Sequence, residues 1–203
     1  MTDLDLYSEC NRGPWNENAE TDTQWALRDR GDRHFILVFP PTQSRQDWLQ
    51  NFDFLATPYK RMPRAWKAHR GWVAKYQSVR DDILQAIQAA DPLFLTVTGF
   101  SQGAALATLA YEDVAFSMLS SGTLRGAGIE GMVFGAPRVV SWTAPSERWL
   151  GFYRYQVRGD IVGMIPPFLF GFKHVGRVLK IGPRHFPDPM RHAAYADCLK
   201  VGA

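Results

Sequence analysis

A pentapeptide centred on a serine is the strongest chemical signal in this sequence. Gly99-Phe100-Ser101-Gln102-Gly103 follows the β-prone run Leu93–Thr98 and precedes a helical stretch from Ala104 to about Leu119. A G-x-S-x-G pattern between a strand and a helix is typical of a strained turn that presents a nucleophilic serine. The start of the helix would direct free N–H groups at a developing oxyanion. We therefore predict that Ser101 is a nucleophile, against the alternative of an ordinary tight turn.

A serine nucleophile needs a base, and the base needs a carboxylate that orients it. In chains of this type the order is serine, then Asp or Glu, then histidine. Asp160 follows the apolar run Phe152–Val157 in a loop that opens with Gly159. Loops after parallel strands carry side chains to the carboxyl edge of the sheet, where ligands bind. Asp160 is therefore a candidate for the acid, although an aspartate in a turn has the same appearance.

Three histidines follow this aspartate in the chain: His174, His185 and His192. His192 comes after the loop Pro187-Asp188-Pro189 and before an Ala-rich helical end, so it could project from a loop onto the site. A single histidine is more often structural than catalytic. The residue pattern alone leaves the choice of base open.

The elements that must position these residues are predicted from hydrophobic patterning. Thr23–Asp29 and Arg33–Phe39 are expected to form a hairpin that turns at Arg30-Gly31-Asp32. Apolar residues at helical spacing predict a helix over Lys75–Ala90, and further strands are expected at Gly131–Phe134 and Phe152–Val157. Strands that alternate with helices indicate an α/β fold with a mostly parallel sheet. With no visible linker, we expect one domain over residues 1–203.

Composition and charge fit a folded domain. The chain has 203 residues, of which 46% are hydrophobic, and a net charge of +3, too small to indicate a nucleic-acid partner. The basic side chains concentrate between Lys60 and Arg80, where seven occur without an acidic residue. A solvated face is the simplest interpretation, and peripheral contact with an anionic lipid surface is the sharper hypothesis.

Several features are absent from the sequence. The first residues contain no basic and apolar leader, which favours a cytoplasmic location, or secretion if a signal has been removed. No apolar run is long enough for a membrane span. No Cys/His cluster has metal-ligand spacing, and we expect neither a metal nor a cofactor. Cys10 and Cys198 could pair if the termini meet, but free thiols fit better without an export signal.

Four sequence blocks together resemble the class 3 lipase family of α/β-hydrolases. They correspond to that family's oxyanion turn and lid start, the beginning of the helix before the serine turn, the serine turn itself, and the strand and loop that carry the acid. In this chain the blocks are VFPPTQSRQDWLQNFDF (38–54), AHRGWVAKY (68–76), LTVTGFSQGAALATLA (95–110), and VFGAPRV (133–139) with RGDIVGMIPP (158–167) and KHVG (173–176). Matching segments run in the family's order from about residue 35 to 195.

The resemblance implies a α/β-hydrolase fold and a triad of Ser101, Asp160 and His192 without a cofactor. His174 falls on a family position that is not the catalytic histidine, and His185 falls on none. The resemblance also implies an oxyanion hole at the backbone amides of Thr42 and Gln102 and a short lid over about residues 43–64. The side chains expected to contact substrate or belong to the lid are Trp48, Leu49, Phe52 and Phe100.

This family resemblance predicts a serine hydrolase of lipid esters that acts through an acyl-enzyme. Acylglycerol lipase, phospholipase A1 and feruloyl esterase activities all remain open. The segment GFSQGAAL also resembles acyl-protein thioesterases and carboxylesterases, although the other blocks do not. Two further alternatives are acyl transfer to an alcohol or thiol and a hydrolase-like binding module without catalysis. Pro40-Pro41 and Gln102 depart from the family pattern, and the chain is shorter than typical members around the lid.

Overall fold

A computed structural model describes residues 1–41, 55–59, 66–119 and 127–201 of the chain. The longer helices are α1 (Asp3–Glu9), α3 (Arg70–Ala90), α4 (Gln102–Val114) and α5 (Tyr195–Val201). The strands are β1 (Asn16–Asn18), β2 (Thr23–Asp29), β3 (His34–Phe39), β4 (Ala56–Tyr59), β5 (Trp66–His69), β6 (Phe94–Phe100), β7 (Gly128–Phe134), β8 (Val140–Ser141), β9 (Phe152–Val157), β10 (Phe172–Lys173) and β11 (Arg177–Ile181). Among the described residues, no helix is long and apolar enough to cross a bilayer.

The main sheet has the strand order β1-β2-β3-β6-β7-β9-β11. Strands β3, β6, β7, β9 and β11 run parallel to one another, whereas β2 pairs antiparallel with both β1 and β3 at one edge. The predicted hairpin of β2 and β3 and the mostly parallel sheet are therefore confirmed. The central strand β3 is covered on both faces, and it is continuously apolar from Phe35 to Phe39. Their carboxyl ends lie along one edge, where Ser101 and Asp160 follow β6 and β9.

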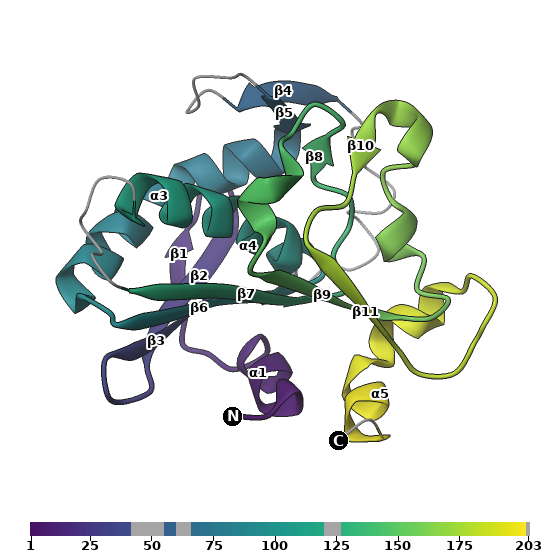
Figure 1. Cartoon of the computed structure of the whole chain (residues 1–203), viewed down its shortest axis with the longest axis horizontal. Coiled ribbons are helices and arrows are strands. Elements are labelled where there is room, and N and C mark those ends of the chain that lie inside the picture. Colours follow the sequence, from purple (N-terminus) through teal and green to yellow (C-terminus); the bar gives the residue numbers. More distant parts are fainter. Residues whose placement is uncertain (42–54, 60–65, 120–126, 202–203) are drawn as a thin grey trace.

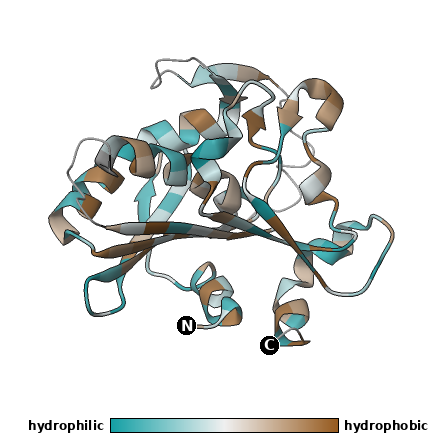
Figure 2. Cartoon of the chain, viewed as in Figure 1, coloured by the Kyte–Doolittle hydropathy of each residue, from teal (hydrophilic) through white to brown (hydrophobic). Residues whose placement is uncertain are grey.

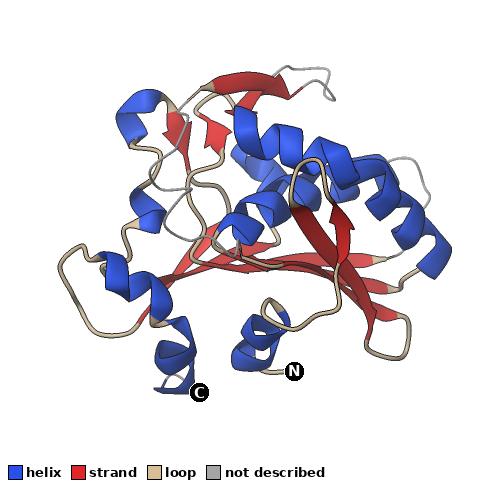
Figure 3. Cartoon of the chain, turned by 180° about the vertical axis from the view of Figure 1, so that it is seen from behind, coloured by secondary structure: helices blue, strands red, loops and turns tan. Residues whose placement is uncertain are grey.

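Helices cover both faces of this sheet (Figures 1 and 3). α3 and α4 lie on one face, and α1 and α5 lie beside each other on the opposite face. Each layer has its own buried apolar cluster. The two clusters share the sheet between them, so the strands that carry the candidate residues are held from above and below. The fold is thus that of an α/β-hydrolase, as predicted.

Helix α3 starts earlier than its pattern predicted, at Arg70 rather than Lys75. Trp72 and Val73 extend the apolar stripe by one turn and are buried with the rest of that face. The helix ends at Ala90, and its C-cap, Asp91, has a left-handed backbone conformation and precedes a proline. α4 is buried along its whole length because small alanines let it lie close to the sheet. It ends at Val114 and continues as one π-helical turn, Ala115–Leu119, within the helical stretch expected there.

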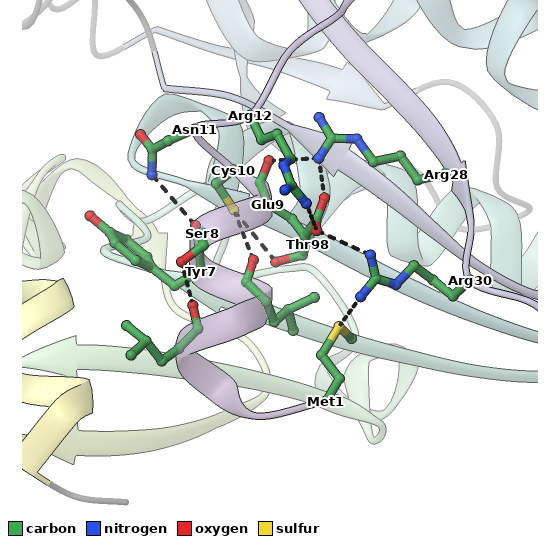
Figure 4. Close-up of polar contacts among 12 residues, drawn as sticks. Met1, Tyr7, Ser8, Glu9, Cys10, Asn11, Arg12, Arg28, Arg30 and Thr98 are labelled. Carbon is green, nitrogen blue, oxygen red and sulfur yellow. Dashed lines mark hydrogen bonds and ion pairs between the residues drawn. The ribbon is translucent and has the colours of Figure 1, made fainter.

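The sequence patterns did not predict helix α1, which closes the lower face of the sheet. Thr2 caps its N-terminus reciprocally with Asp5. At its other end the buried carboxylate of Glu9 accepts hydrogen bonds from Arg28 of β2 and from Arg30 just after that strand (Figure 4). Burying a carboxylate is costly unless it is paired in this way. Helix α1 is therefore held against the sheet by a specific ion-pair cluster.

A second, four-stranded sheet has the order β10-β8-β5-β4 and lies beyond the N-terminal end of α3 (Figure 1). Strand β4 belongs to the segment predicted as a lid, residues 43–64. Of that segment only residues 55–59 are described, and there Tyr59 is buried and stacked on Trp66. The rest of the predicted lid lies outside the described residues. The assignment of residues 1–203 to one domain stays a prediction.

Both cysteines are free thiols. Cys10 is buried at the end of α1, where its sulfur lies 3.7 Å from the hydroxyl of Thr98 in β6 (Figure 4). Burial raises the pKa of the Cys10 thiol to about 12. Cys198 is half-buried in α5. The structure therefore agrees with the prediction of free thiols.

Candidate active site

The turn that carries Ser101 is held by close backbone packing. Ser101 has a positive φ of 59°, which a non-glycine residue adopts only under constraint. A Cβ atom on Gly99 would lie 2.3 Å from the Gly103 carbonyl oxygen, and one on Gly103 would lie 2.1 Å from that of Phe39. Only glycine fits at either position. The two glycines of the pentapeptide thus allow β6, the turn and α4 to approach one another.

The start of helix α4 offers free amides beside the serine. Ser101 is the N-cap, and its carbonyl oxygen accepts hydrogen bonds from the amides of Ala104 and Ala105. The amides of Gln102 and Gly103 come earlier in the first turn and have no acceptor within the helix. This is where an oxyanion beside Ser101 would be bound. Thr42, the second predicted donor, lies outside the described residues.

Asp160 is buried just beyond the end of β9. Its Oδ1 accepts a hydrogen bond of 2.9 Å from the backbone amide of Val162. Its Oδ2 lies 2.9 Å from Nδ1 of His192. A carboxylate can only accept, so Nδ1 of the neutral imidazole carries the proton and Nε2 carries the lone pair. The structure thus brings two residues together that lie 32 positions apart in the sequence.

His192 is carried by a short 3₁₀ helix, η5 (Pro189–Ala193), which the side chain of Asp188 caps. Its imidazole stacks on the ring of Phe100 with centroids 4.8 Å apart. The ring also packs against Gly135, where an added Cβ would lie 2.7 Å from Cε1. Phe100 directly precedes Ser101, so His192 lies against the segment that carries the serine.

Ser101 has a hydroxyl group that can donate a hydrogen bond, and His192 has a ring nitrogen that can accept one. The Oγ of Ser101 and the Nε2 of His192 are both buried and have no hydrogen-bond partner among the described residues. The structure therefore has no hydrogen bond between them. Catalytic hydrogen bonds of this kind are often long before substrate binds and shorten in the complex. An imidazole with a free lone pair, oriented by a buried carboxylate, is suited to accept the proton of a serine hydroxyl.

Tyr195 is a further residue at this site that the sequence reasoning did not identify. Its hydroxyl donates a 2.7 Å hydrogen bond to Oδ2 of Asp160, the same oxygen that faces His192. It also accepts one from the amide of Val157. Burial, together with the charge of Asp160, raises the pKa of Tyr195 well above its usual value, so the hydroxyl stays a donor. Tyr195 lies three residues after His192 on the start of α5, and only this spacing could have marked it.

The other two histidines lie elsewhere. Nε2 of His174 donates to the carbonyl oxygen of Gly163 at 2.7 Å. Burial and the nearby charge of Arg154 lower the pKa of His174 to about 3, so it is a neutral structural residue. His185 is exposed and its Nδ1 bonds the carbonyl oxygen of Phe186. Of the three histidines, only His192 contacts Asp160.

The predicted substrate contacts have mixed outcomes. Trp48, Leu49 and Phe52 lie outside the described residues. Phe100 differs from the prediction: its side chain is fully buried among α1, α5 and the sheet, because strand alternation directs it to the lower face. Its ring therefore supports His192 instead of facing a substrate or belonging to a lid.

In its described part, residues 66–80, the basic stretch predicted between Lys60 and Arg80 does not form one solvated face. The amine of Lys75 donates to the carbonyl oxygens of Thr21 and Asp22, and the guanidinium of Arg80 pairs with the buried Asp113. These two cations stabilise the fold. Lys67 and Arg70 are exposed, whereas the earlier residues of the stretch lie outside the described residues. The described part thus offers less cationic surface than the sequence indicated.

Comparison with known families and structures gives a consistent result. The family model "Lipase (class 3)" matches residues 36–170. A phospholipase A1 from rice, "Phospholipase A1-II 6", is 27% identical and aligns with 78% of this chain and 46% of its own. A lipase from Rhizopus niveus is 30% identical over 75% of this chain and 40% of its own. The chain spans less than half the length of these two relatives.

Solved structures share the fold. Lipase II from Rhizopus niveus superposes with a TM-score of 0.71 and 26% identity, covering 83% of this chain and 65% of the lipase. A triacylglycerol lipase that is described as having a serine protease triad as its catalytic centre superposes with a TM-score of 0.73 and 23% identity. That match covers 84% of this chain and 66% of the lipase.

Proposed function

The chain belongs to the class 3 lipase family, and from this premise we propose that it hydrolyses carboxylic esters of lipids with Ser101, His192 and Asp160 as its triad. The observation that carries the proposal is the 2.9 Å contact between His192 Nδ1 and the buried Asp160, beside a serine on a strained turn. Where a buried carboxylate fixes the tautomer of an imidazole next to a constrained serine, the imidazole can take the serine proton and so make the serine a nucleophile.

In the proposed reaction, Oγ of Ser101 attacks the acyl carbon while Nε2 of His192 takes the hydroxyl proton. Asp160 stabilises the imidazolium that forms. The negative charge on the carbonyl oxygen is stabilised by the amide of Gln102 and, from the family resemblance, that of Thr42. His192 then protonates the leaving alcohol, and an acyl ester remains on Ser101. Water, activated by the same imidazole, releases the fatty acid and restores the serine.

Acylglycerols and phospholipids are the two substrate classes that the relatives support. One relative is named a lipase and the other a phospholipase A1. Both reactions break an acyl ester through the same intermediate and differ in the group that leaves. Phospholipase A1 activity is the second candidate, and the rice relative is the observation that favours it.

The test is hydrolysis of p-nitrophenyl esters, from acetyl to palmitoyl, by the wild type and by Ser101→Ala. We expect the variant to lose a factor of about 10⁴ to 10⁶ in kcat, as for removal of a triad nucleophile. Equal activity of the two proteins would show that Ser101 is not the nucleophile. Two inactive proteins, with Ser101 unlabelled by a fluorophosphonate, would indicate a binding module instead.

Product analysis separates the remaining alternatives. Triacylglycerol, phosphatidylcholine, a feruloyl ester and an acyl thioester are offered separately, and the released acid is measured. A competing alcohol is then added, because an acyltransferase forms a new ester where a hydrolase forms the free acid. Release of the acid from a glycerolipid, with little new ester, is the expected result.

A further inference from the structure

Three large apolar side chains stand exposed on one short turn, η4 (Phe168–Phe170). Phe168 is 56% exposed, Leu169 89% and Phe170 57%. Single exposed apolar residues are common, but a contiguous exposed patch usually marks a binding surface. In Figure 2 this turn is the brown segment that projects from the upper part of the molecule, away from the sheet.

The turn is braced from within. The guanidinium of Arg138 donates to the carbonyl oxygens of Met164 and Pro166, the latter at 2.8 Å. The amide of Arg138 donates to the carbonyl oxygen of Ile165 at 2.7 Å. The ring of Trp142 packs against that of Phe168 in a tilted arrangement, with centroids 4.8 Å apart. These contacts fix the backbone that carries the apolar side chains. Binding a partner therefore costs less conformational entropy.

The turn belongs to the same edge of the molecule as the proposed triad. Asp160, the short helix η3 (Val162–Met164) and η4 follow one another within eleven residues. Met164 in η3 is half exposed, and Met190, two residues before His192, is also exposed. Figures 1 and 3 both show η4 and the loop after β11 projecting from this end, where the strands finish. Apolar surface therefore extends along the edge on which an ester would be cleaved.

A basic cavity of about 510 Å³ opens on this edge. Its lining comprises Gln156, Val157, Arg158, Gly159, Lys180, Arg184 and His185, with no acidic residue. Within the described chain, neither Lys180 nor Arg184 contacts a carboxylate, and the guanidinium of Arg158 donates only to the carbonyl oxygen of Gly182. Three cations without counter-ions around one cavity attract an anion.

The cavity adjoins both the triad loop and the apolar surface. Gly159, in its lining, directly precedes Asp160 and packs against the backbone of Phe186, which is 89% exposed. Gln156, also in its lining, packs against Gly163 of η3. The cavity thus lies between the loop that ends in η4 and the loop that leads to His192. A ligand there would be held beside the acid of the triad.

We infer that this edge is a docking face for the surface of an anionic phospholipid aggregate. The docking face consists of the η4 turn, which inserts among the acyl chains, and the cavity of Arg158, Lys180 and Arg184, which takes a headgroup phosphate. The inference rests on the proposed function in assuming a lipid substrate. A projecting apolar turn beside unpaired cations complements a layer whose interior is apolar and whose surface carries negative charge.

The test measures binding alone, on the Ser101→Ala background, so that vesicles stay intact and the result does not depend on catalysis. Full-length protein is co-sedimented with vesicles of phosphatidylcholine, with or without phosphatidylglycerol. We expect Leu169→Ser to weaken binding to both vesicle types at least about tenfold. Lys180→Gln with Arg184→Gln weakens binding to the anionic vesicles alone, about fivefold per charge and so roughly 30-fold.

Matched controls lie away from the cavity. Leu150→Ser removes an exposed leucine before β9, and Arg12→Gln with Arg33→Gln removes two exposed charges, one just after α1 and one just before β3. Both control proteins should bind vesicles like the parent, and thermal unfolding checks that all variants fold. Inorganic phosphate and glycerol phosphate then compete with the anionic vesicles. Competition by glycerol phosphate alone supports a headgroup site, and competition by both supports a general phosphate site that the headgroup occupies.

Three results would overturn the inference. The first is that both docking-face variants bind vesicles like the parent. The second is that the control variants lose as much binding as the docking-face variants, because only bulk charge or hydrophobicity would then matter. The third is a parent protein that binds no vesicle and self-associates, with Leu169→Ser restoring the monomer, because the turn would then be a contact between copies. Ester hydrolysis by the wild type, measured separately, shows whether the proposed function fails as well.

Discussion

Replacing Tyr195 by phenylalanine tests how Asp160, the acid of the proposed triad, is held in place. The change keeps the buried ring and removes one hydroxyl, which donates to Oδ2 of Asp160 at 2.7 Å and accepts from the amide of Val157 at 3.2 Å. Asp160 then keeps two donors, His192 and the amide of Val162. The buried carboxylate loses a third of its hydrogen bonds without any change in the volume of the core.

The magnitude follows from the type of bond. A hydrogen bond to a charged group contributes about 1.5–3 kcal/mol, and the bond from the Val157 amide is longer and weaker. We expect a destabilisation of about 2 kcal/mol and, for a chain of this length, a fall in Tm of about 4–8 °C. Because Asp160 orients His192, kcat should fall by about tenfold, far less than the factor of about 10⁴ expected for loss of the carboxylate itself.

The assay combines urea unfolding with hydrolysis of p-nitrophenyl butyrate at a temperature where the variant is fully folded. An unchanged KM with a lower kcat marks a positioning role, since a purely structural loss would leave kcat of the folded enzyme unaltered. Tyr59→Phe is the matched control, because the Tyr59 hydroxyl is buried without a partner among the described residues. Tyr59→Phe should leave the free energy of unfolding unchanged or raise it slightly. A Tyr195→Phe protein with wild-type kcat would refute the reasoning.

The remaining predictions concern stability and reactivity. Gly103→Ala places a Cβ 2.1 Å from a backbone oxygen, so urea unfolding should show a loss of about 3 kcal/mol or more; Gly71→Ala, with ordinary contacts, should not. Burial raises the pKa of Glu112 from 4.5 to about 7, so the folded state holds its proton more tightly. Stability should therefore fall as pH rises through this range, and Glu112→Gln should flatten the pH dependence of Tm. Iodoacetamide should label Cys198 in the native protein but not Cys10, as mass spectrometry would show.

The serine turn was predictable because its causes are local. A buried strand, two glycines spaced around a serine and a helix of small residues determine the backbone there, and all three lie within one short stretch of sequence. The hairpin of β2 and β3 was predictable for the same reason, since a turn and two apolar runs follow one another directly. Such features depend on contacts between residues that are close in the chain. Residue types and their spacing are therefore enough to predict them.

The acid and the base were less accessible to sequence reasoning. Asp160, the three later histidines and their loops each have ordinary structural interpretations, and patterning left the base open. The family resemblance selected His192. In the structure His192 lies against Asp160, whereas His174 bonds the carbonyl oxygen of Gly163. Which histidine meets the acid depends on how the loop after β11 returns to the sheet edge.

By itself the sequence determined the α/β class, the succession of the main strands and helices along the chain, and the turn that carries the proposed nucleophile. Only the tertiary structure decided that Tyr195 bonds Asp160, that Phe100 supports His192 from below, and that unpaired cations meet beside an exposed apolar turn. Periodicity reports which face of an element is buried, but not which distant element covers it. Contacts between residues far apart in the chain are set by strand order, register and loop path, which belong to the fold as a whole.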